Sequence, residues 1–138
     1  YIKNEALKLD IYRRIAAVEN EAEQEDMLEE LIDRFGDPPR SVLNLLEITR
    51  LRGQAHELYI REIKGRTDQI TFIMYEKAGI DAARIPELIE RMKGAMVFRR
   101  SEPVQFIYTI NSQKAGKNPP GLLTVAFQVL EEMRILKA

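Results

Sequence analysis

Four acidic side chains of this chain could together bind basic groups from one side of a helix. Asp26, Glu29, Glu30 and Asp33 recur at spacings of three and four residues, and such spacings make side chains neighbours on a helix surface. Carboxylates grouped in this way are suited to contact Arg or Lys side chains of a partner. An acidic helix face is also a common solvated surface, so the spacing alone leaves both interpretations open.

Residue types that carry nucleophilic or metal chemistry are scarce. The chain of 138 residues contains no Cys and one His, His56, which excludes a thiolate nucleophile and a Cys/His metal set. Gly116 and Lys117 lack the earlier Gly and the Ser or Thr of a phosphate-binding loop. We therefore expect no catalytic, cofactor-binding or metal-binding residues in this chain, and no enzyme activity.

A second charged group has the opposite sign. Arg99, Arg100, Lys114 and Lys117 could form a basic edge near Tyr108, and single-stranded nucleic acids bind to such charge combined with stacking aromatics. The net charge of −1 and the isoelectric point of about 6.0 are unlike those of a typical nucleic-acid-binding domain. Solvated loop charges explain the pattern as well, and nucleic-acid binding is the alternative function.

The composition is that of a folded, water-soluble chain. Hydrophobic residues make up 45% of the sequence, and there is no apolar run of the length that a membrane-spanning helix needs. The chain starts at Tyr1 without an initiator Met or a signal-peptide pattern. We expect a cytoplasmic protein without a membrane partner, and a fragment of something longer.

Helical and strand-like periodicities follow one another in the order α-α-α-β-β-α-β-β-α. Helices that precede a region of mixed elements are typical of the α+β class. Because an isolated hairpin is marginally stable, we expect the two hairpins to share one four-stranded antiparallel sheet, covered on one side by helices.

We treat 1–138 as a single domain with a helical part, 1–60, and a ββαββα part, 61–138. The predicted helices are 5–18, one that ends at Phe35, one from Pro38 to about 58, 81–93 and one from about Pro120, and the predicted strands are 60–64, 70–75, 96–99 and 104–108.

A tight joint separates the second and third predicted helices. Gly36 follows the apolar face that ends at Phe35, and glycine is the residue that most readily ends a helix. Asp37 could then cap the next helix, and Pro38 could occupy its first position. The joint is therefore predicted to set the angle between two long helices.

Two further local signals concern these helices. Asn20 followed by Glu23 predicts a capping box at the start of the second helix. Gly53 lies inside the third predicted helix, where glycine costs about 1 kcal/mol relative to alanine. It is either a weak point of that helix or a position where a neighbouring backbone approaches closely.

The joint and its surroundings resemble the C-terminal domain of the bacterial transcription-repair coupling factor. The resemblance extends over essentially the whole chain and is most specific in residues 7–60. It is carried by the segments LEELIDRFGDPP at 28–39, LDIYRRIA at 9–16, LLEI at 45–48 and LRGQA at 51–55.

The resemblance implies a parent protein that is an ATP-driven translocase on double-stranded DNA, of the helicase superfamily. Such a factor displaces stalled RNA polymerase and recruits nucleotide excision repair by binding UvrA through a UvrB-like module. ATP and Mg would belong to the parent's motor, which this chain lacks. The C-terminal domain would be autoinhibitory, because it packs on the UvrB-like module, masks the UvrA-binding surface and restrains the motor.

The resemblance also favours one interpretation of the acidic face. The UvrA-binding surface of the family is basic, and a charged, exchangeable interface suits a cover that must be released. We therefore hypothesise that Glu30 and Asp33, flanked by Asp26 and Glu29, form an interdomain interface with Arg side chains of the UvrB-like module.

Overall fold

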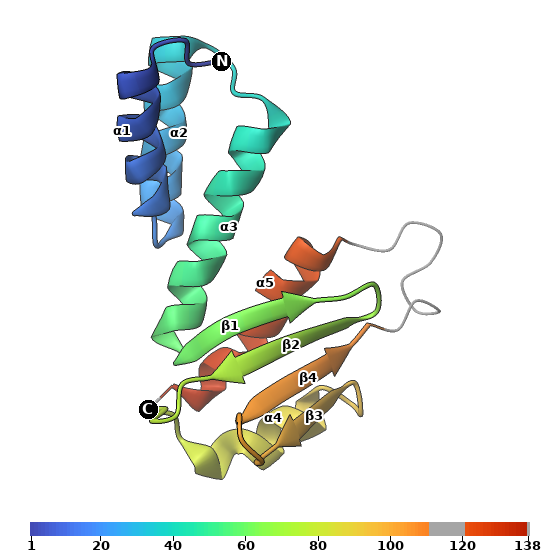
Figure 1. Cartoon of the computed structure of the whole chain (residues 1–138). Coiled ribbons are helices and arrows are strands. Elements are labelled where there is room, and N and C mark those ends of the chain that lie inside the picture. The colour runs from blue at the N-terminus through green and yellow to red at the C-terminus, as the bar shows by residue number, and fades with distance from the viewer. Residues whose placement is uncertain (111–120, 138) are drawn as a thin grey trace. The chain divides into compact units, whose positions relative to one another are not determined.

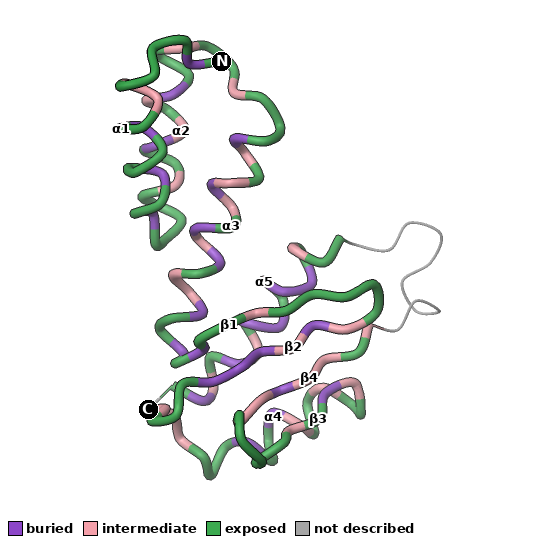
Figure 2. The backbone as a smooth tube through the Cα atoms, viewed as in Figure 1, coloured by how far each residue is buried: buried purple, intermediate pink, exposed green. Residues whose placement is uncertain are grey.

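The computed structural model describes residues 1–110 and 121–137. They divide into two compact units, Tyr1–Gln54 and Ala55–Ala138. The division falls in the last turn of a long helix. Each unit has its own buried residues (Figure 2).

The first unit is helical. It contains α1 (Glu5–Ala16), α2 (Glu21–Phe35) and most of α3 (Arg40–Glu57), with α1 and α2 lying side by side (Figure 1). Helical spacing predicts an apolar stripe of Leu7, Ile11, Ile15 and Val18 within 5–18. It is confirmed, since the last three are buried and Leu7 packs against them. For α2 the sequence predicts an apolar face of Leu28, Leu31, Ile32 and Phe35, and this prediction was partly wrong, because Ile32 is 42% exposed. The remaining buried core residues of this cluster are Ile2, Met27, Leu31, Val42 and Leu46.

Asparagine caps hold the starts of α1 and α2. The Asn4 side chain accepts a hydrogen bond from the Leu7 N–H at 3.1 Å, and Asn20 Oδ1 accepts one from the Glu23 N–H at 2.8 Å. The Glu23 carboxylate in turn accepts from the N–H of Glu19 at 3.0 Å, one residue before the donor of a standard capping box. The predicted cap at Asn20 is confirmed, with this shift in its second hydrogen bond.

The joint after α2 is tight, but it differs from the prediction. Gly36 ends α2 with φ of +83°, as expected for a glycine after a helix. The next helix begins at Arg40 rather than at Pro38, and the Val42 and Leu43 N–H groups both donate to the Pro39 carbonyl. A residue before proline is disfavoured in helical conformation, so Pro39 keeps Pro38 out of the helix.

The second unit contains one sheet. Its strands are β1 (Ile60–Gly65), β2 (Gln69–Met74), β3 (Met96–Arg99) and β4 (Gln105–Thr109), in the spatial order β1-β2-β4-β3 with every pair antiparallel. The helical elements are η1 (Ala82–Arg84), α4 (Ile85–Arg91), α5 (Leu122–Met133) and η2 (Arg134–Leu136). The α+β class, the element order and the shared four-stranded antiparallel sheet are thus confirmed.

Helices cover one face of this sheet. Phe72, Phe106 and Phe98 are cross-strand neighbours on that face, and Phe72 and Phe106 are fully buried. Helices α4 and α5 lie on the same side (Figure 1), and an ion pair of 2.8 Å joins Arg91 of α4 to Glu132 of α5. The buried apolar face of the sheet is therefore the floor of the second core.

An irregularity in the pairing of β1 determines which of its residues lie on the covered face of the sheet. The pairing with β2 shifts between Ile60 and Glu62, so that Ile60 is opposite Met74 and Ile63 is opposite Phe72. A bulge adds one residue to a strand. It therefore lets two isoleucines at an odd spacing of three both face the core.

No helix among the residues 1–110 and 121–137 combines the length and apolar character needed to cross a membrane.

Candidate interaction site on the acidic face of α2

Helix α2 carries all four predicted acidic residues on one side. With 3.6 residues per turn, Asp26, Glu29, Glu30 and Asp33 fall within about 100° of the helix circumference, largely opposite the buried Leu31. Asp26, Glu29 and Asp33 are exposed, and Glu30 is half-buried. We call these four residues the acidic face.

Glu30 differs from the other three because it is held by arginines. Arg14 of α1 donates to both carboxylate oxygens, through Nη2 to Oε1 at 2.6 Å and through Nη1 to Oε2. Arg34, one turn further along α2, donates to Oε2 at 3.4 Å. Both oxygens of Glu30 therefore already face a guanidinium, in the forked geometry that binds carboxylates best.

This pairing changes the acid–base properties of both partners. The hydrogen bonds from Arg14, with smaller contributions from its charge and from Arg34, lower the pKa of Glu30. The same hydrogen bond raises the pKa of Arg14. Both shifts favour the charged pair, so Glu30 is a carboxylate that is neutralised within the unit.

The three remaining carboxylates of the acidic face are accessible to a partner. Within the described parts of the chain, neither Asp26 nor Glu29 nor Asp33 forms an ion pair within 4.0 Å. Their helix is fixed on its other side by the buried Met27 and Leu31. The acidic face thus presents three carboxylates from a rigid backbone, which lowers the entropy that a partner's binding would have to overcome.

A shallow groove borders the acidic face between α1 and α2. Its volume is about 350 Å³. Buried apolar side chains and charged side chains both line it. The lining residues are Arg14, Ala17, Val18, Glu23, Asp26, Met27 and Glu30. Arg14 is the residue of this site that the sequence analysis missed, because nothing along the chain relates it to Glu30, sixteen residues later.

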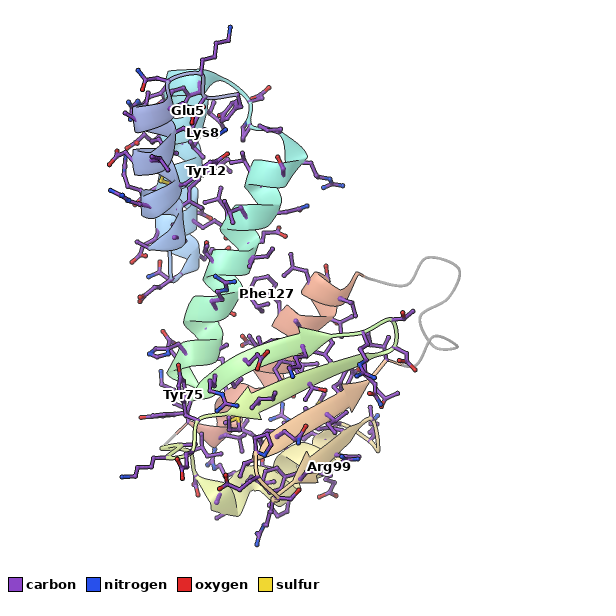
Figure 3. The ribbon with its side chains drawn as sticks, viewed as in Figure 1. Glu5, Lys8, Tyr12, Tyr75, Arg99 and Phe127 are labelled. Atoms are coloured by element: carbon purple, nitrogen blue, oxygen red, sulfur yellow. The ribbon has the colours of Figure 1, made fainter. Side chains whose placement is uncertain are left out.

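The structure separates the residues of the predicted basic edge. Arg99 ends β3 and is exposed (Figure 3), with Gln105 as its cross-strand neighbour. Tyr108 is the neighbour of the buried Met96, and these two face the opposite side of the sheet from Arg99. Lys114 and Lys117 lie outside the described residues. The stacking aromatic and the exposed arginine are therefore on different faces.

His56 is an exposed residue near the end of α3. Its ring lies edge-on to that of Tyr75, with 5.9 Å between centroids. No group of three or more His, Cys, Asp or Glu side chains in residues 1–110 and 121–137 is arranged to hold a metal ion.

The sequence of this chain is similar to those of known proteins. The sequence profile of the TRCF domain family matches residues 1–85. Transcription-repair-coupling factors are similar over most of the chain: that of Haemophilus influenzae is 37% identical over 107 residues (77% of this chain, 9% of the relative), and that of Escherichia coli K12 is 32% identical over 114 residues (83% and 10%). The chain thus spans about a tenth of the length of the curated relatives it matches.

A solved structure agrees with the fold. The crystal structure of the C-terminal domain of a transcription-repair coupling factor superposes with a TM-score of 0.71 at 19% sequence identity, covering 99% of this chain and 84% of that chain. At this identity the likeness bears on the fold alone, and the family assignment depends on the sequence matches. The chain belongs to the TRCF domain family of transcription-repair coupling factors.

Proposed function

We propose that this domain is an autoinhibitory interaction domain within a transcription-coupled DNA repair translocase. In this proposal it packs on a UvrB-like module of the same protein, masks the surface that binds UvrA, and restrains the motor until RNA polymerase is engaged. Membership of the TRCF domain family supports the identity of the parent. The acidic face supports the proposed electrostatic contact with a basic surface of the UvrB-like module.

The observation that carries the proposal is the presence of unpaired carboxylates on a rigid helix. Asp26, Glu29 and Asp33 are exposed together on α2, without ion-pair partners among the residues that the structure describes. A basic surface would gain contacts with all three, and such polar contacts can be exchanged when a competing partner arrives. This combination of complementarity and reversibility is what a removable cover requires.

In this proposal, other parts of the parent protein bind ATP and move along DNA. We propose that ATP and Mg bind in the motor, that the motor moves along double-stranded DNA in the cytoplasm, and that this domain contributes no catalytic residue. Its effect on catalysis would be indirect, through the interface with the UvrB-like module and through restraint of the motor.

The experiment is a binding titration between this chain and a separately expressed UvrB-like module, followed by isothermal calorimetry. The test variant combines Glu29→Gln with Asp33→Asn, which removes two charges with little change in shape. The control combines Glu5→Gln on α1 with Glu25→Gln on α2, which removes the same charge from exposed positions outside the acidic face.

We expect the test variant to bind at least tenfold more weakly, since about 1.4 kcal/mol corresponds to a factor of ten, while the control binds nearly as tightly as the wild type. Equal weakening by both variants would show only a long-range effect of net charge and would contradict a specific acidic interface. Failure of the wild type to bind would contradict the proposal itself.

Nucleic-acid binding through Arg99 and Arg100 has less support, because Tyr108 lies on the other face of the sheet from Arg99. A titration with DNA at several salt concentrations distinguishes the two functions. Phosphate contacts would produce a steep loss of affinity with salt, together with a lower affinity of Arg99→Gln.

A further inference from the structure

Within the acidic face, Glu30 is the residue least ready to meet a partner. The forked contact with Arg14 occupies both carboxylate oxygens, and Arg34 adds a third donor on Oε2. A carboxylate offers about four acceptor positions, so one is left for an incoming guanidinium. That guanidinium would also be repelled by the two arginines already present.

The same contact is built to be reversible. The side chains of Arg14 and Glu30 are 43% and 32% exposed, and exposed ion pairs are weak, about 0.2–1 kcal/mol. Arg14 lies on α1 and Glu30 on α2, so their separation would leave the cap at Asn20 and the buried residues Ile15 and Leu31 unchanged. Breaking this ion pair therefore requires no unfolding.

From this arrangement we infer that Arg14 is an internal competitor for Glu30, which regulates how tightly the acidic face holds a basic partner. With Arg14 in place, the face presents Asp26, Glu29 and Asp33, and Glu30 is withheld. When Arg14 is displaced, Glu30 becomes a fourth contact. The inference rests on the proposed function, since it concerns the regulation of the same interface.

The groove between α1 and α2 supports the inferred competition of Arg14 for Glu30. Arg14 and Glu30 line it together with the buried apolar side chains of Val18 and Met27. When the guanidinium of Arg14 leaves Glu30, its aliphatic stem can therefore stay on this apolar surface while its charged end reaches solvent. The exchange would thus leave all four carboxylates of the acidic face to the partner.

The variant Arg14→Gln tests the inference, with Arg13→Gln as its matched control. Both variants remove one positive charge from adjacent exposed positions on α1, but only Arg14 pairs with Glu30. Affinity for the UvrB-like module is measured by calorimetry. The carboxyl chemical shift of Glu30 is followed against pH by NMR as a reading that needs no partner.

If Arg14 competes for Glu30, Arg14→Gln binds the module about two- to fivefold more tightly than Arg13→Gln does, the range that corresponds to an exposed ion pair. The pKa of Glu30 rises in Arg14→Gln alone. In a Glu30→Gln background the advantage of Arg14→Gln disappears, because no competition is left.

The inference would be overturned if Arg14→Gln bound no more tightly than Arg13→Gln. Weaker binding by Arg14→Gln would show instead that Arg14 orients Glu30 for the partner. These results are distinguishable from failure of the proposed function, in which the Glu29→Gln, Asp33→Asn variant keeps full affinity or the wild type does not bind.

Discussion

Gly53 of α3 lies directly against the backbone of Glu19. A Cβ added at Gly53 would be 2.5 Å from the Glu19 carbonyl oxygen and 2.7 Å from its Cα. Both positions belong to the first unit. Of the two interpretations of this glycine, close approach of a neighbouring backbone is therefore confirmed, and it explains why a helix interior contains a residue that disfavours helices.

The variant Gly53→Ala is expected to destabilise the first unit. In an open helix the change would stabilise by about 1 kcal/mol, but here a backbone has to move, and overpacking costs about 1–3 kcal/mol. The free energy of unfolding is measured in urea by circular dichroism, with Arg52→Ala as an exposed control in the same helix. A more stable Gly53→Ala variant would contradict the close contact.

The pair of Arg14 and Glu30 predicts a dependence of stability on pH. The pKa of Glu30 is lowered in the folded state by the hydrogen bonds from Arg14. Its contribution is therefore fully present above the ordinary glutamate pKa of about 4.3 and is lost as the pH falls through the lower folded-state value. Because the pair is exposed, we expect about 1 kcal/mol or less.

The measurement is the difference in unfolding free energy between wild type and Glu30→Gln as a function of pH. It should be largest near neutral pH and vanish in acid. The variant Glu29→Gln is the control, since no ion pair is formed by Glu29 with a described residue. A difference that grows toward acid would show that Glu30 is not stabilised as a carboxylate.

Asn20 is expected to be important for the start of α2. Its side chain accepts from the Glu23 N–H at 2.8 Å, and loss of such a cap costs about 0.5–2 kcal/mol. We predict that Asn20→Ala lowers the free energy of unfolding by about 1 kcal/mol, whereas Asn20→Ser retains most of it. Equal stability of the two variants would mean that the cap contributes little.

Tyr1 joins the N-terminal residues to the end of α2 through hydrogen bonds and a ring contact. Its hydroxyl donates toward the carbonyl oxygens of Leu31 at 3.1 Å and Gly36 at 2.7 Å, and its ring lies 5.8 Å from that of Phe35. Burial, with a smaller effect of the Asp37 charge, raises the pKa of Tyr1.

Tyr1→Phe keeps the ring contact and removes the donor, so we predict a loss of about 0.5–1.5 kcal/mol in unfolding free energy. Tyr12→Phe is the matched control: Tyr12 has no hydrogen bond to any described residue, and its ring faces Lys8 at 5.9 Å (Figure 3). A loss of the same size in both variants would contradict the role of the Tyr1 hydroxyl.

The sequence alone determined the features that depend on neighbours along the chain. Helical spacing placed Ile11 and Ile15 in the core, and the cap at Asn20 and the stop at Gly36 follow from local backbone chemistry. Alternation between polar and apolar residues predicted the strands, and hence the α+β class. The segments that resemble known coupling factors, such as 28–39, indicate the family without reference to the fold.

Only the tertiary structure decided which distant residues meet. Arg14 and Glu30 are on different helices, Gly53 and Glu19 are more than thirty residues apart, and the bulge in β1 shows only in its pairing with β2. The side of the sheet on which Arg99 and Tyr108 lie depends on the strand register, since one step moves a side chain to the other face. These contacts depend on packing between elements, whereas periodicity describes each element by itself.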